Sequence, residues 1–518
     1  MAVRLPQSES LGISEFLRNT EASRKMANVM LDESNKSSLG QFMTPVCVAS
    51  FMASMFDFDA QRQIRLLDPG AGVGSLTSAL VARIAEFGSG FSISADAFEI
   101  DEVMRRYLPD NLQECRIQAE LAGNSFEYKI FPDDFVSKSV QAISAARSLW
   151  GGELPGYTHC IMNPPYRKIP GNCHHAAGLK SIGIDAVNLY SAFMALAIEL
   201  LEPGGQLVAI VPRSFCNGSY YRPFREFLLK RSAIVRMHLF ASRKNAFKDD
   251  NVLQENIVVK LVKGGCQGYV LVTSSTDQSL ADMSHVSFPF NQIVLPEDAE
   301  KYIHVPTDSR SDCHMYPMAV RYSLADIGID VSTGPVVDFR HRNDLFFEPA
   351  DGTVPLVYSC HFSGQRADWP KIGGKKPNAI AVNADTARWL FPMGCYVVSR
   401  RFSSKEERRR VVASLFEPEL FPGFPAIGFE NHLNVFHSRR RGLPRNLALG
   451  LVVYLNSSLV DACFRRFSGH TQVNATDLRL MKYPSRDALV YLGDSAESLG
   501  ALSQEQIDDL LRKVIDEQ

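Results

Sequence analysis

An asparagine, two prolines and a tyrosine stand at residues 163–166, directly after an apolar run at 157–162. Proline cannot donate to a sheet ladder, so a strand over the apolar run must end at Asn163. The side-chain oxygen of Asn163 and the carbonyl of Pro164 are two acceptors, and the rigid prolines fix the direction of that carbonyl. Two acceptors aimed at the hydrogens of a conjugated exocyclic amine would pull its nitrogen toward tetrahedral geometry. These residue types are compatible with a substrate site at the end of the strand, where the Tyr166 ring offers a flat face; the alternative is a Pro-Pro turn that merely ends a strand.

A glycine-rich turn at residues 66–76 (LLDPGAGVGSL) follows a second apolar run and opens a helical pattern. Its three alternating glycines let a ligand approach the backbone closely. The spacing D-P-G-x-G-x-G is not that of a pyrophosphate cradle, and no P-loop Lys-Ser/Thr follows, which disfavours phosphate binding. A later apolar run ends at Glu99, where an acid can accept both ribose hydroxyls of an adenosine, and Ile100 can pack on the adenine face. The alternative is an ordinary α/β turn with a solvated acid.

The composition is that of a large globular protein. The 518 residues are 45% hydrophobic and 22% charged, and the length predicts two or three domains. A formal net charge of −2 argues against a chain that binds polyanions over its whole surface. The ten cysteines form no C-x-x-C pair, which is typical of a reduced, cytoplasmic protein with buried thiols.

Signals for export, membranes and metals are weak. The N-terminal residues lack the apolar core of a signal peptide, and no apolar stretch is long enough to span a bilayer. Cys173, His174 and His175 stand together, but no second ligand pair follows at a zinc spacing. We therefore expect no membrane partner and no metal.

The first half of the chain alternates strand and helix patterns, which predicts an α/β fold with a mostly parallel sheet. A run at 188–205 is apolar nearly all round and ends in Pro-Gly-Gly, which indicates a buried helix with a stop. After residue 265 the strands become short and irregular, so we expect a domain boundary there and a mixed α+β C-terminal domain. The expected strands of the first half lie near residues 64–69, 91–98, 157–163, 205–212 and 255–264.

Basic residues gather late in the chain. The run at 399–412 is either a solvated helix face or a contact for phosphates. The run at 437–446 is denser, lies beside glycine and proline, and lacks compensating acids. Its Arg439, Arg440 and Arg441 predict a loop that meets the phosphates of a nucleic acid.

The glycine turn and its acid resemble the cofactor site of class I S-adenosylmethionine-dependent methyltransferases, which have a Rossmann-like sheet. The resemblance implies that the turn surrounds the methionine end of S-adenosylmethionine and that Glu99 holds the ribose. Asp134 and Phe135 match the position that contacts the adenine amine and ring, and Asp133 is an equally possible register. The resemblance also places Thr44 in a motif (GQFMTP) that contacts the methionine moiety. The implied cofactor-binding residues are Thr44, Pro45, Asp68, Pro69, Gly70, Ala71, Gly72, Glu99, Ile100, Asp134 and Phe135.

The N-P-P-Y segment resembles the catalytic motif of amino methyltransferases. Its order after the GQFMTP segment and the glycine turn is similar to that of the gamma group of DNA adenine-N6 methyltransferases from type II restriction–modification systems. Such enzymes flip the target adenine out of duplex DNA. A later segment resembles the motif that supplies an aromatic ring to the other face of the base, with a buried core phenylalanine as the alternative. The implied catalytic residues are Asn163, Pro164, Pro165, Tyr166 and Phe247.

The long C-terminal half resembles a target-recognition domain. The implied division is an N-terminal helical extension (1–35), a methyltransferase domain (36–265) and a DNA-binding domain (266–518). Four residues of the DNA-binding domain would contact base edges or phosphates, with a polar capped turn before a helix as the alternative: His470, Thr471, Gln472 and Asn474.

Only about 39 residues precede the GQFMTP segment, too few for a nuclease domain. We therefore expect a separately encoded restriction endonuclease as partner. The alternative functions are an RNA or protein amino methyltransferase, and an inactive DNA-binding defence subunit. Cytosine-N4 methylation, usually with Ser or Asp at the first motif position, is disfavoured by Asn163.

Overall fold

The computed structural model divides the chain into two compact units, Met1–Ser309 and Arg310–Gln518. The first unit therefore extends beyond the expected boundary at residue 265, because two further strands continue its sheet. The structure describes residues 15–31, 43–58, 62–148, 153–240, 255–296, 298–306, 317, 319–403, 407–467, 472–500 and 502–516.

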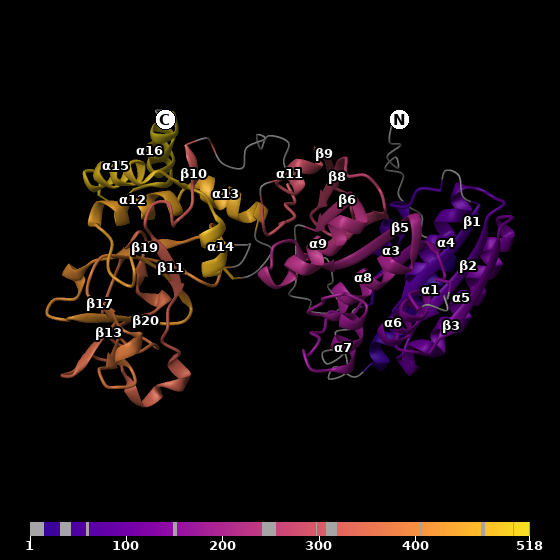
Figure 1. The fold of residues 1–518 in the computed structure, drawn as a ribbon, viewed down its shortest axis with the longest axis horizontal. Coiled ribbons are helices and arrows are strands. Elements are labelled where there is room, and N and C mark those ends of the chain that lie inside the picture. The colour runs from indigo at the N-terminus through magenta and orange to yellow at the C-terminus, as the bar shows by residue number, and fades with distance from the viewer. Residues whose placement is uncertain are drawn as a thin grey trace. The chain divides into compact units, whose positions relative to one another are not determined.

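A nine-stranded sheet forms the centre of the first unit (Figure 1). Its strand order is β3-β2-β1-β4-β5-β7-β6-β8-β9. The five strands from β3 to β5 are parallel to one another, whereas β7 is antiparallel to both of its neighbours. The strands are β1 (Gln63–Pro69), β2 (Ser92–Phe98), β3 (Ser125–Phe131), β4 (Tyr157–Met162), β5 (Leu201–Pro212), β6 (Ser232–Phe240), β7 (Asn256–Lys263), β8 (Tyr269–Ser275) and β9 (Ser284–Pro289).

The expected α/β class and all five expected strands are confirmed, as β1, β2, β4, β5 and β7. Four strands were not expected. β3 and β9 lie at the two ends of the sheet order, and their burial alternates or is low, so neither has a continuous apolar run. β6 and β8 are more buried, but polar side chains interrupt their apolar pattern.

Helices cover both faces of this sheet and form two separate apolar cores. The helix α8 is the expected buried helix, and the Asn188 side chain caps it by accepting from the backbone N–H of Ser191 at 3.2 Å. One face carries α1 (Glu15–Met30), α3 (Val46–Ser54), α4 (Ser75–Phe87) and α5 (Glu102–Leu121). The other carries α6 (Phe135–Ala146), α7 (His174–Ser181), α8 (Leu189–Leu200), η1 (Arg213–Cys216), η2 (Ser219–Tyr221), α9 (Arg222–Arg231) and α11 (Phe290–Ile293).

The second unit contains short strands in three small sheets, as the irregular sequence pattern predicted. The six-stranded sheet has β11 (Asp330–Thr333), β21 (Leu433–His437), β18 (Tyr396–Arg400), β19 (Ala413–Phe416), β15 (Arg366–Ala367) and β14 (Phe362–Ser363). The five-stranded sheet has β12 (Leu345–Phe346), β16 (Ala379–Ala381), β13 (Thr353–Val357), β20 (Ala426–Phe429) and β17 (Phe391–Pro392). The pair is β10 (Val320–Tyr322) with β22 (Tyr483–Pro484). The 3₁₀ helices are η3 (Asp338–Arg340), η4 (Arg342–Asp344), η5 (Ser359–His361), η6 (Ala387–Trp389) and η7 (Pro418–Leu420).

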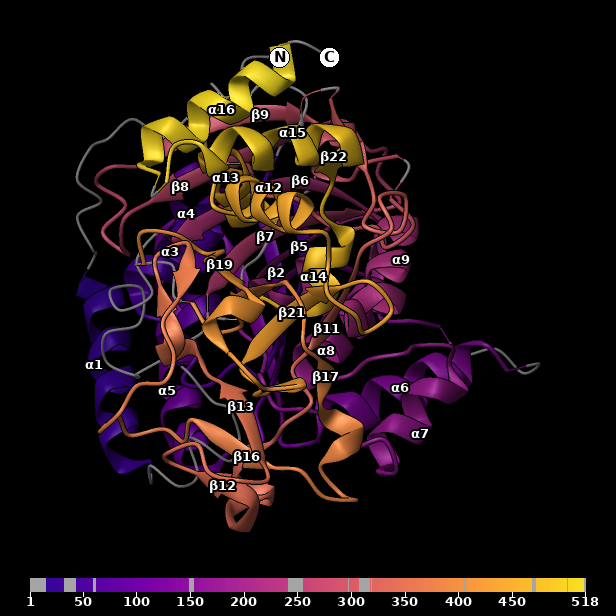
Figure 2. The same cartoon turned by 90° about the vertical axis from the view of Figure 1, so that its left-hand side faces the viewer.

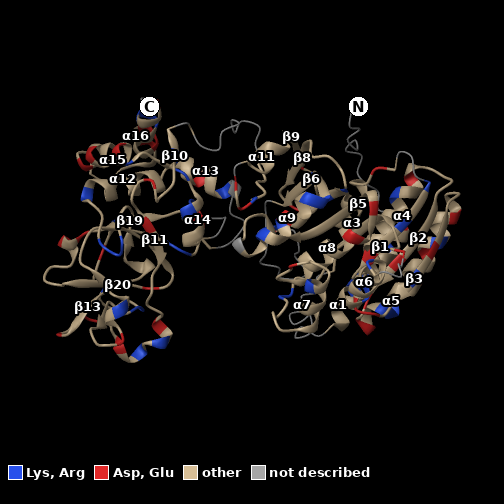
Figure 3. Cartoon of the chain, in the orientation of Figure 1, with Lys and Arg blue, Asp and Glu red and all other residues tan. Residues whose placement is uncertain are grey.

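The helices of the second unit come late in the chain, and α12, α15 and α16 lie side by side in both views (Figures 1 and 2). Among the described residues, no single helix has the length and apolar character of a membrane span; the bent pair α12–α13 and the shorter α8 come nearest. Acidic and basic residues are interspersed over both units (Figure 3). The helices are α12 (Arg445–Leu455), α13 (Ser458–Phe467), α14 (Ala475–Leu480), α15 (Arg486–Glu497) and α16 (Gln504–Asp516).

The packing of α12 against α15 depends on two glycines. A Cβ added to Gly450 would lie 1.7 Å from the carbonyl oxygen of Leu489, and one added to Gly493 would lie 1.8 Å from the carbonyl oxygen of Asn446. Backbone atoms cannot move aside as a flexible side chain can, so the two helices approach each other closely only without side chains at these positions.

We expect Gly450→Ala to destabilise the second unit by about 3 kcal/mol or more, because the added methyl group overlaps backbone. The matched control is Gly268→Ala, where an added Cβ meets nothing within 4 Å. Thermal unfolding followed by circular dichroism measures both variants. Equal melting temperatures for the two variants would contradict the packing argument.

Candidate active site

The pairing of β1 with β4 brings the two candidate motifs together. Leu66 lies opposite His159 and Leu67 opposite Cys160, so the ends of the two parallel strands lie at the same edge. The turn after β1 reaches the motif after β4 there, since a Cβ added to Gly70 would be 4.0 Å from the carbonyl oxygen of Asn163. Gly70 has a φ of +79°, which a residue with a side chain rarely adopts.

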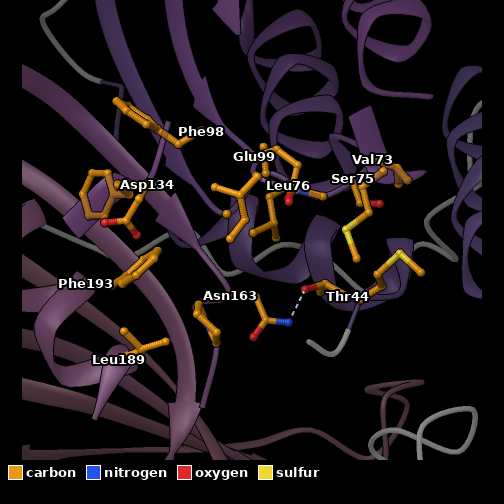
Figure 4. A pocket seen from close by; sticks show the side chains of 18 of the residues that line it. Thr44, Val73, Ser75, Leu76, Phe98, Glu99, Asp134, Asn163, Leu189 and Phe193 are labelled. Atoms are coloured by element: carbon orange, nitrogen blue, oxygen red, sulfur yellow. Dashed lines mark hydrogen bonds between the residues drawn. The ribbon is translucent and has the colours of Figure 1, made fainter. Parts of the chain in front are cut away.

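A cavity of about 210 Å³ opens at this edge (Figure 4). It is lined by residues of the glycine turn, the end of β2, the start of α6, α8 and the N-P-P-Y segment. The expected site residues that line it are Thr44, Gly70, Ala71, Gly72, Glu99, Ile100, Asp134, Phe135, Asn163 and Pro165. Those expected at the site that lie outside the lining are Pro45, Asp68, Pro69, Pro164 and Tyr166.

Glu99 is held as an acceptor at the end of β2. Its Oε2 accepts from the backbone N–H of Gly72 at 2.7 Å, and its Oε1 accepts from that of Asp101 at 2.8 Å. The side chain is buried, and this burial raises the pKa of Glu99 against the lowering effect of the two N–H donors. Glu99 lines the cavity, and a carboxylate there suits an acceptor for hydroxyl groups.

Asp68 stabilises the glycine turn without lining the cavity. Its Oδ2 accepts from the Thr77 hydroxyl at 2.6 Å, which ties the end of β1 to the first turn of α4. The carboxyl is completely buried, and its Oδ1 has no hydrogen-bond partner among the described residues. Burial is the main cause that raises the pKa of Asp68 to about 7, and the nearby charge of Glu99 adds to it.

Asp134 begins α6 at the cavity wall. Its carboxylate accepts from the backbone N–H of Ser137 at 2.8 Å and lies 2.9 Å from Nε2 of His175. Burial raises its pKa, but the Ser137 bonds and His175 outweigh burial, so the pKa of Asp134 is lowered overall. Asp133 also lines the cavity, so the two registers remain open.

The ligand atoms of Asp134, His174 and His175 lie within 4.8 Å of one another, a spacing compatible with a metal ion. Protein partners already face these imidazoles. Nε2 of His175 meets Asp134, and Nε2 of His174 lies 3.4 Å from the Ser137 hydroxyl.

Hydrogen bonds hold both the nitrogen and the oxygen of the Asn163 side-chain amide, and Figure 4 shows the bond from the nitrogen to Thr44. Its Nδ2 donates to the Thr44 hydroxyl at 3.0 Å, and its Oδ1 accepts from the Tyr166 hydroxyl at 3.1 Å. The two bonds together hold the plane of the Asn163 amide in one orientation. Tyr166 also lies 3.4 Å from the carbonyl oxygen of Ile210, and its ring packs edge-on against Tyr190 at 6.1 Å.

Several residues that line the cavity were not predicted as site residues from the sequence. Phe193 and Leu189 come from α8, which was expected only as a buried helix; His175 lies in the segment considered for metal binding. The position of α8, the second helix after the N-P-P-Y segment, was the available signal for these residues. The remaining unassigned lining residues are Met43, Val73, Ser75, Leu76, Phe98, Met104 and Arg167.

The expected DNA contacts of the second unit are only partly described. Asn474 caps α14 in a reciprocal pair with Asp477, so the capped-turn alternative holds for this residue. Gln472 pairs with Phe402 and its side-chain oxygen lies 3.5 Å from the Arg401 guanidinium. Arg439, Arg440 and Arg441 lie at a turn after β21. Phe247, His470 and Thr471 lie outside the described residues.

The basic run at 399–412 is not a helix face in its described part. It contains the end of β18 and the residues that lead into β19. Arg410 is completely buried, and its Nε donates to the Ser403 hydroxyl at 3.1 Å. At least this arginine has a structural position rather than an exposed one.

The sheet order places the glycine turn after β1 and the acid after β2, as the resemblance to class I S-adenosylmethionine-dependent methyltransferases implied. The profile of the Eco57I restriction-modification methylase family matches residues 66–247. Over 504 residues, 97% of this chain and 99% of the relative, the sequence is 46% identical to the type II methyltransferase M.BsuBI of Bacillus subtilis. It is 42% identical to the type II methyltransferase M.PstI of Providencia stuartii, over 95% of each chain. The chain therefore belongs to the family of type II DNA methyltransferases of restriction–modification systems.

A solved structure shares the fold over both units. The type IIL restriction-modification enzyme MmeI, solved in complex with DNA, has a TM-score of 0.51 and 11% identity over 97% of this chain and 72% of its own. This likeness extends to the second unit as well as to the sheet of the first.

We expect Thr44→Val to lower the turnover number about 10- to 100-fold while cofactor affinity changes little, because the Asn163 amide loses the acceptor that orients it. Thr44→Ser keeps a hydroxyl and should restore most of the activity. The measurement is steady-state methyl transfer beside cofactor titration by calorimetry. In an Asn163→Ala background, Thr44→Val should add nothing further; full additivity of the two substitutions would contradict the coupling.

We expect Asp68→Asn to change the pH dependence of stability. Between its unfolded value near 3.8 and its folded pKa of about 7, Asp68 binds a proton in the folded chain that the unfolded chain has released. The free energy of unfolding therefore falls as pH rises through this window, and the variant lacks that fall. Its stability relative to the parent should rise by on the order of 3 kcal/mol between about pH 4 and about pH 7 and then stay level. Urea unfolding at several pH values measures this, and a constant difference contradicts it.

Proposed function

We propose that the protein transfers a methyl group from S-adenosylmethionine to the N6 amine of an adenine flipped out of duplex DNA. The observation that carries this proposal is the Asn163 amide, fixed by Thr44 and Tyr166 at the rim of a cavity that the glycine turn also lines. The family membership supplies DNA as the substrate class. N6 specificity rests on the match of Asn163 to the first position of the adenine-type motif.

The residues of the cavity fit the cofactor. When bound, S-adenosylmethionine supplies an electrophilic methyl group. The Glu99 carboxylate faces the cavity from between its two N–H donors and would accept the ribose hydroxyls. Half-exposed Ile100 and buried Phe135 would pack on the adenine ring. The glycine turn leaves space for the methionine end, because side chains are absent where the backbone lines the wall.

The chain's own groups would prepare the target amine. Asn163 Oδ1 accepts from the Tyr166 hydroxyl and would also accept one hydrogen of the target amine. The Pro164 carbonyl would accept the other hydrogen, and the target nitrogen would then direct its lone pair at the methyl group. No strong general base is required, since the methylated nitrogen is cationic and loses its proton readily afterwards.

The sheet topology supports a second aromatic wall from Phe247. β7 is antiparallel, with Asn256 opposite Pro212 and Ile257 opposite Leu239. β6 therefore ends, and β7 begins, at the edge of the sheet where β4 ends. Tyr166 and Phe247 would stack on the two faces of the flipped base, at about 1–3 kcal/mol per stacked ring.

The second unit would read a short duplex site, as a target-recognition domain does, through major-groove contacts. We further propose that methylation protects cytoplasmic host DNA from a separately encoded nuclease with the same site. The nine described cysteines are free thiols, as a reducing compartment requires.

The test is to incubate the chain with unmethylated genomic DNA and labelled S-adenosylmethionine, then to separate the nucleosides by mass. We expect labelled N6-methyladenine that saturates at a limited number of sites, whereas labelled N4-methylcytosine or label only in RNA or protein would refute the proposal. Asn163→Ala should lower turnover at least about 100-fold with cofactor affinity retained, whereas Glu99→Gln should mainly weaken cofactor binding.

A further inference from the structure

An unusual turn follows β21. Ser438 and Arg441 exchange two backbone hydrogen bonds, at 2.9 Å and 2.8 Å, around the central residues Arg439 and Arg440. Both central residues are left-handed, with φ of +50° and +63°. Two-residue turns of this kind ordinarily take Asn-Gly, because left-handed backbone strains a residue with a long side chain. Arginine at both positions indicates a requirement on the side chains.

Neighbouring groups hold this strained backbone in place. The backbone N–H of Arg439 donates to Oδ2 of Asp330 at 3.0 Å, and that of Arg440 donates to Nδ1 of His437 at 3.1 Å. These contacts tie the turn to β11 and to the end of β21. The directions in which the arginine side chains leave the turn are thereby determined.

The two central arginines have different surroundings. The Arg440 guanidinium donates to the carbonyl oxygens of Arg388 and Leu390, at 3.1 Å and 3.3 Å, and lies 4.5 Å from the centre of the Phe391 ring. Arg440 therefore fastens the turn to the five-stranded sheet. Arg439 instead lines a hollow on the surface of the second unit.

This arginine hollow has a volume of about 690 Å³ and is lined by Gly328, Ser438, Arg439, Arg441, Gly442, Leu443, Pro444 and Arg486. Its three arginines are exposed, and Arg486 is anchored by a bond from its NH1 group to the carbonyl oxygen of Ile327 at 2.7 Å. Among the described residues, no carboxylate lies within ion-pair distance of these three guanidinium groups. The nearby Asp330 is engaged by the backbone of Arg439.

We propose that the arginine hollow binds phosphate groups of the DNA backbone, with Arg439 and Arg441 as direct contacts and Arg440 as their support. Guanidinium groups match phosphate oxygens with paired N–H donors, and three uncompensated ones around a concave surface favour a dianionic or repeated anionic ligand. This inference rests on the proposed function for its choice of DNA. Phosphate contacts carry no base information, so the arginine hollow orients the second unit on any duplex.

The turn supplies a matched pair of variants. Arg439→Asn and Arg440→Asn remove the same charge from adjacent left-handed positions, which asparagine tolerates. Binding to a duplex that the parent chain methylates is measured by fluorescence anisotropy across a salt series. Each lost phosphate contact should reduce the slope of log affinity against log salt by about 0.9, so a fourfold rise in salt weakens binding about 3.5-fold less.

We expect this reduced slope for Arg439→Asn and for Arg441→Gln. Arg440→Asn should keep the parent slope and lower the melting temperature. Equal slopes in all variants, or an equal reduction in Arg440→Asn, would overturn the inference. A second outcome would also overturn the inference: millimolar inorganic phosphate stabilises the chain against unfolding only when Arg439 is present, while the salt slope for DNA is the same in all variants. The arginine hollow would then bind a free phosphate. Failure of the parent chain to bind and methylate DNA would refute the proposed function itself.

Discussion

The site depends on the register between β1 and β4. These strands are about ninety residues apart in the chain, and their parallel pairing places the glycine turn beside Asn163. A shift of one residue would turn each side chain to the opposite face and move the turn away from the amide. The buried side chains of both strands oppose such a shift, because helices cover both faces of the sheet.

Two buried carboxyl groups near the glycine turn have separate tasks. Glu99 receives two backbone N–H donors and faces the cavity, whereas Asp68 receives one hydroxyl and braces the turn from behind. Burial raises the pKa of both, and the charge of Glu99 raises the pKa of Asp68 further. The two N–H donors favour the charged form of Glu99 and so oppose the effect of its burial on the pKa.

The fold class and much of the site could be predicted from the sequence, because continuous apolar runs and the two motifs are local signals. The edge strands β3 and β9 lack such runs, since solvent reaches part of each. The Thr44–Asn163 bond joins residues 119 positions apart, and only the folded sheet brings them together. Asp68 illustrates the limit of a motif: its type and position were right for a cofactor contact, yet its side chain points behind the turn toward Thr77. The first unit ends at Ser309 and not at the expected residue 265, because β8 and β9 extend the sheet beyond β7. The pairing of these strands could not be seen in the sequence.

The pairing of β10 with β22 has a consequence for where the sequence of the second unit can change. β10 lies near the start of the second unit and β22 near its end, so one antiparallel pair closes the segment between them. That segment, residues 323–482, is called the cassette here because the β10–β22 pair, its clamp, joins its two ends. Most of the strands in the cassette are only two to five residues long. Loops inside the cassette can diverge between relatives without disturbing the clamp or the catalytic sheet. The helix α12 inside this segment packs closely on α15 outside it, so the changes that the second unit can accept are those that keep this contact.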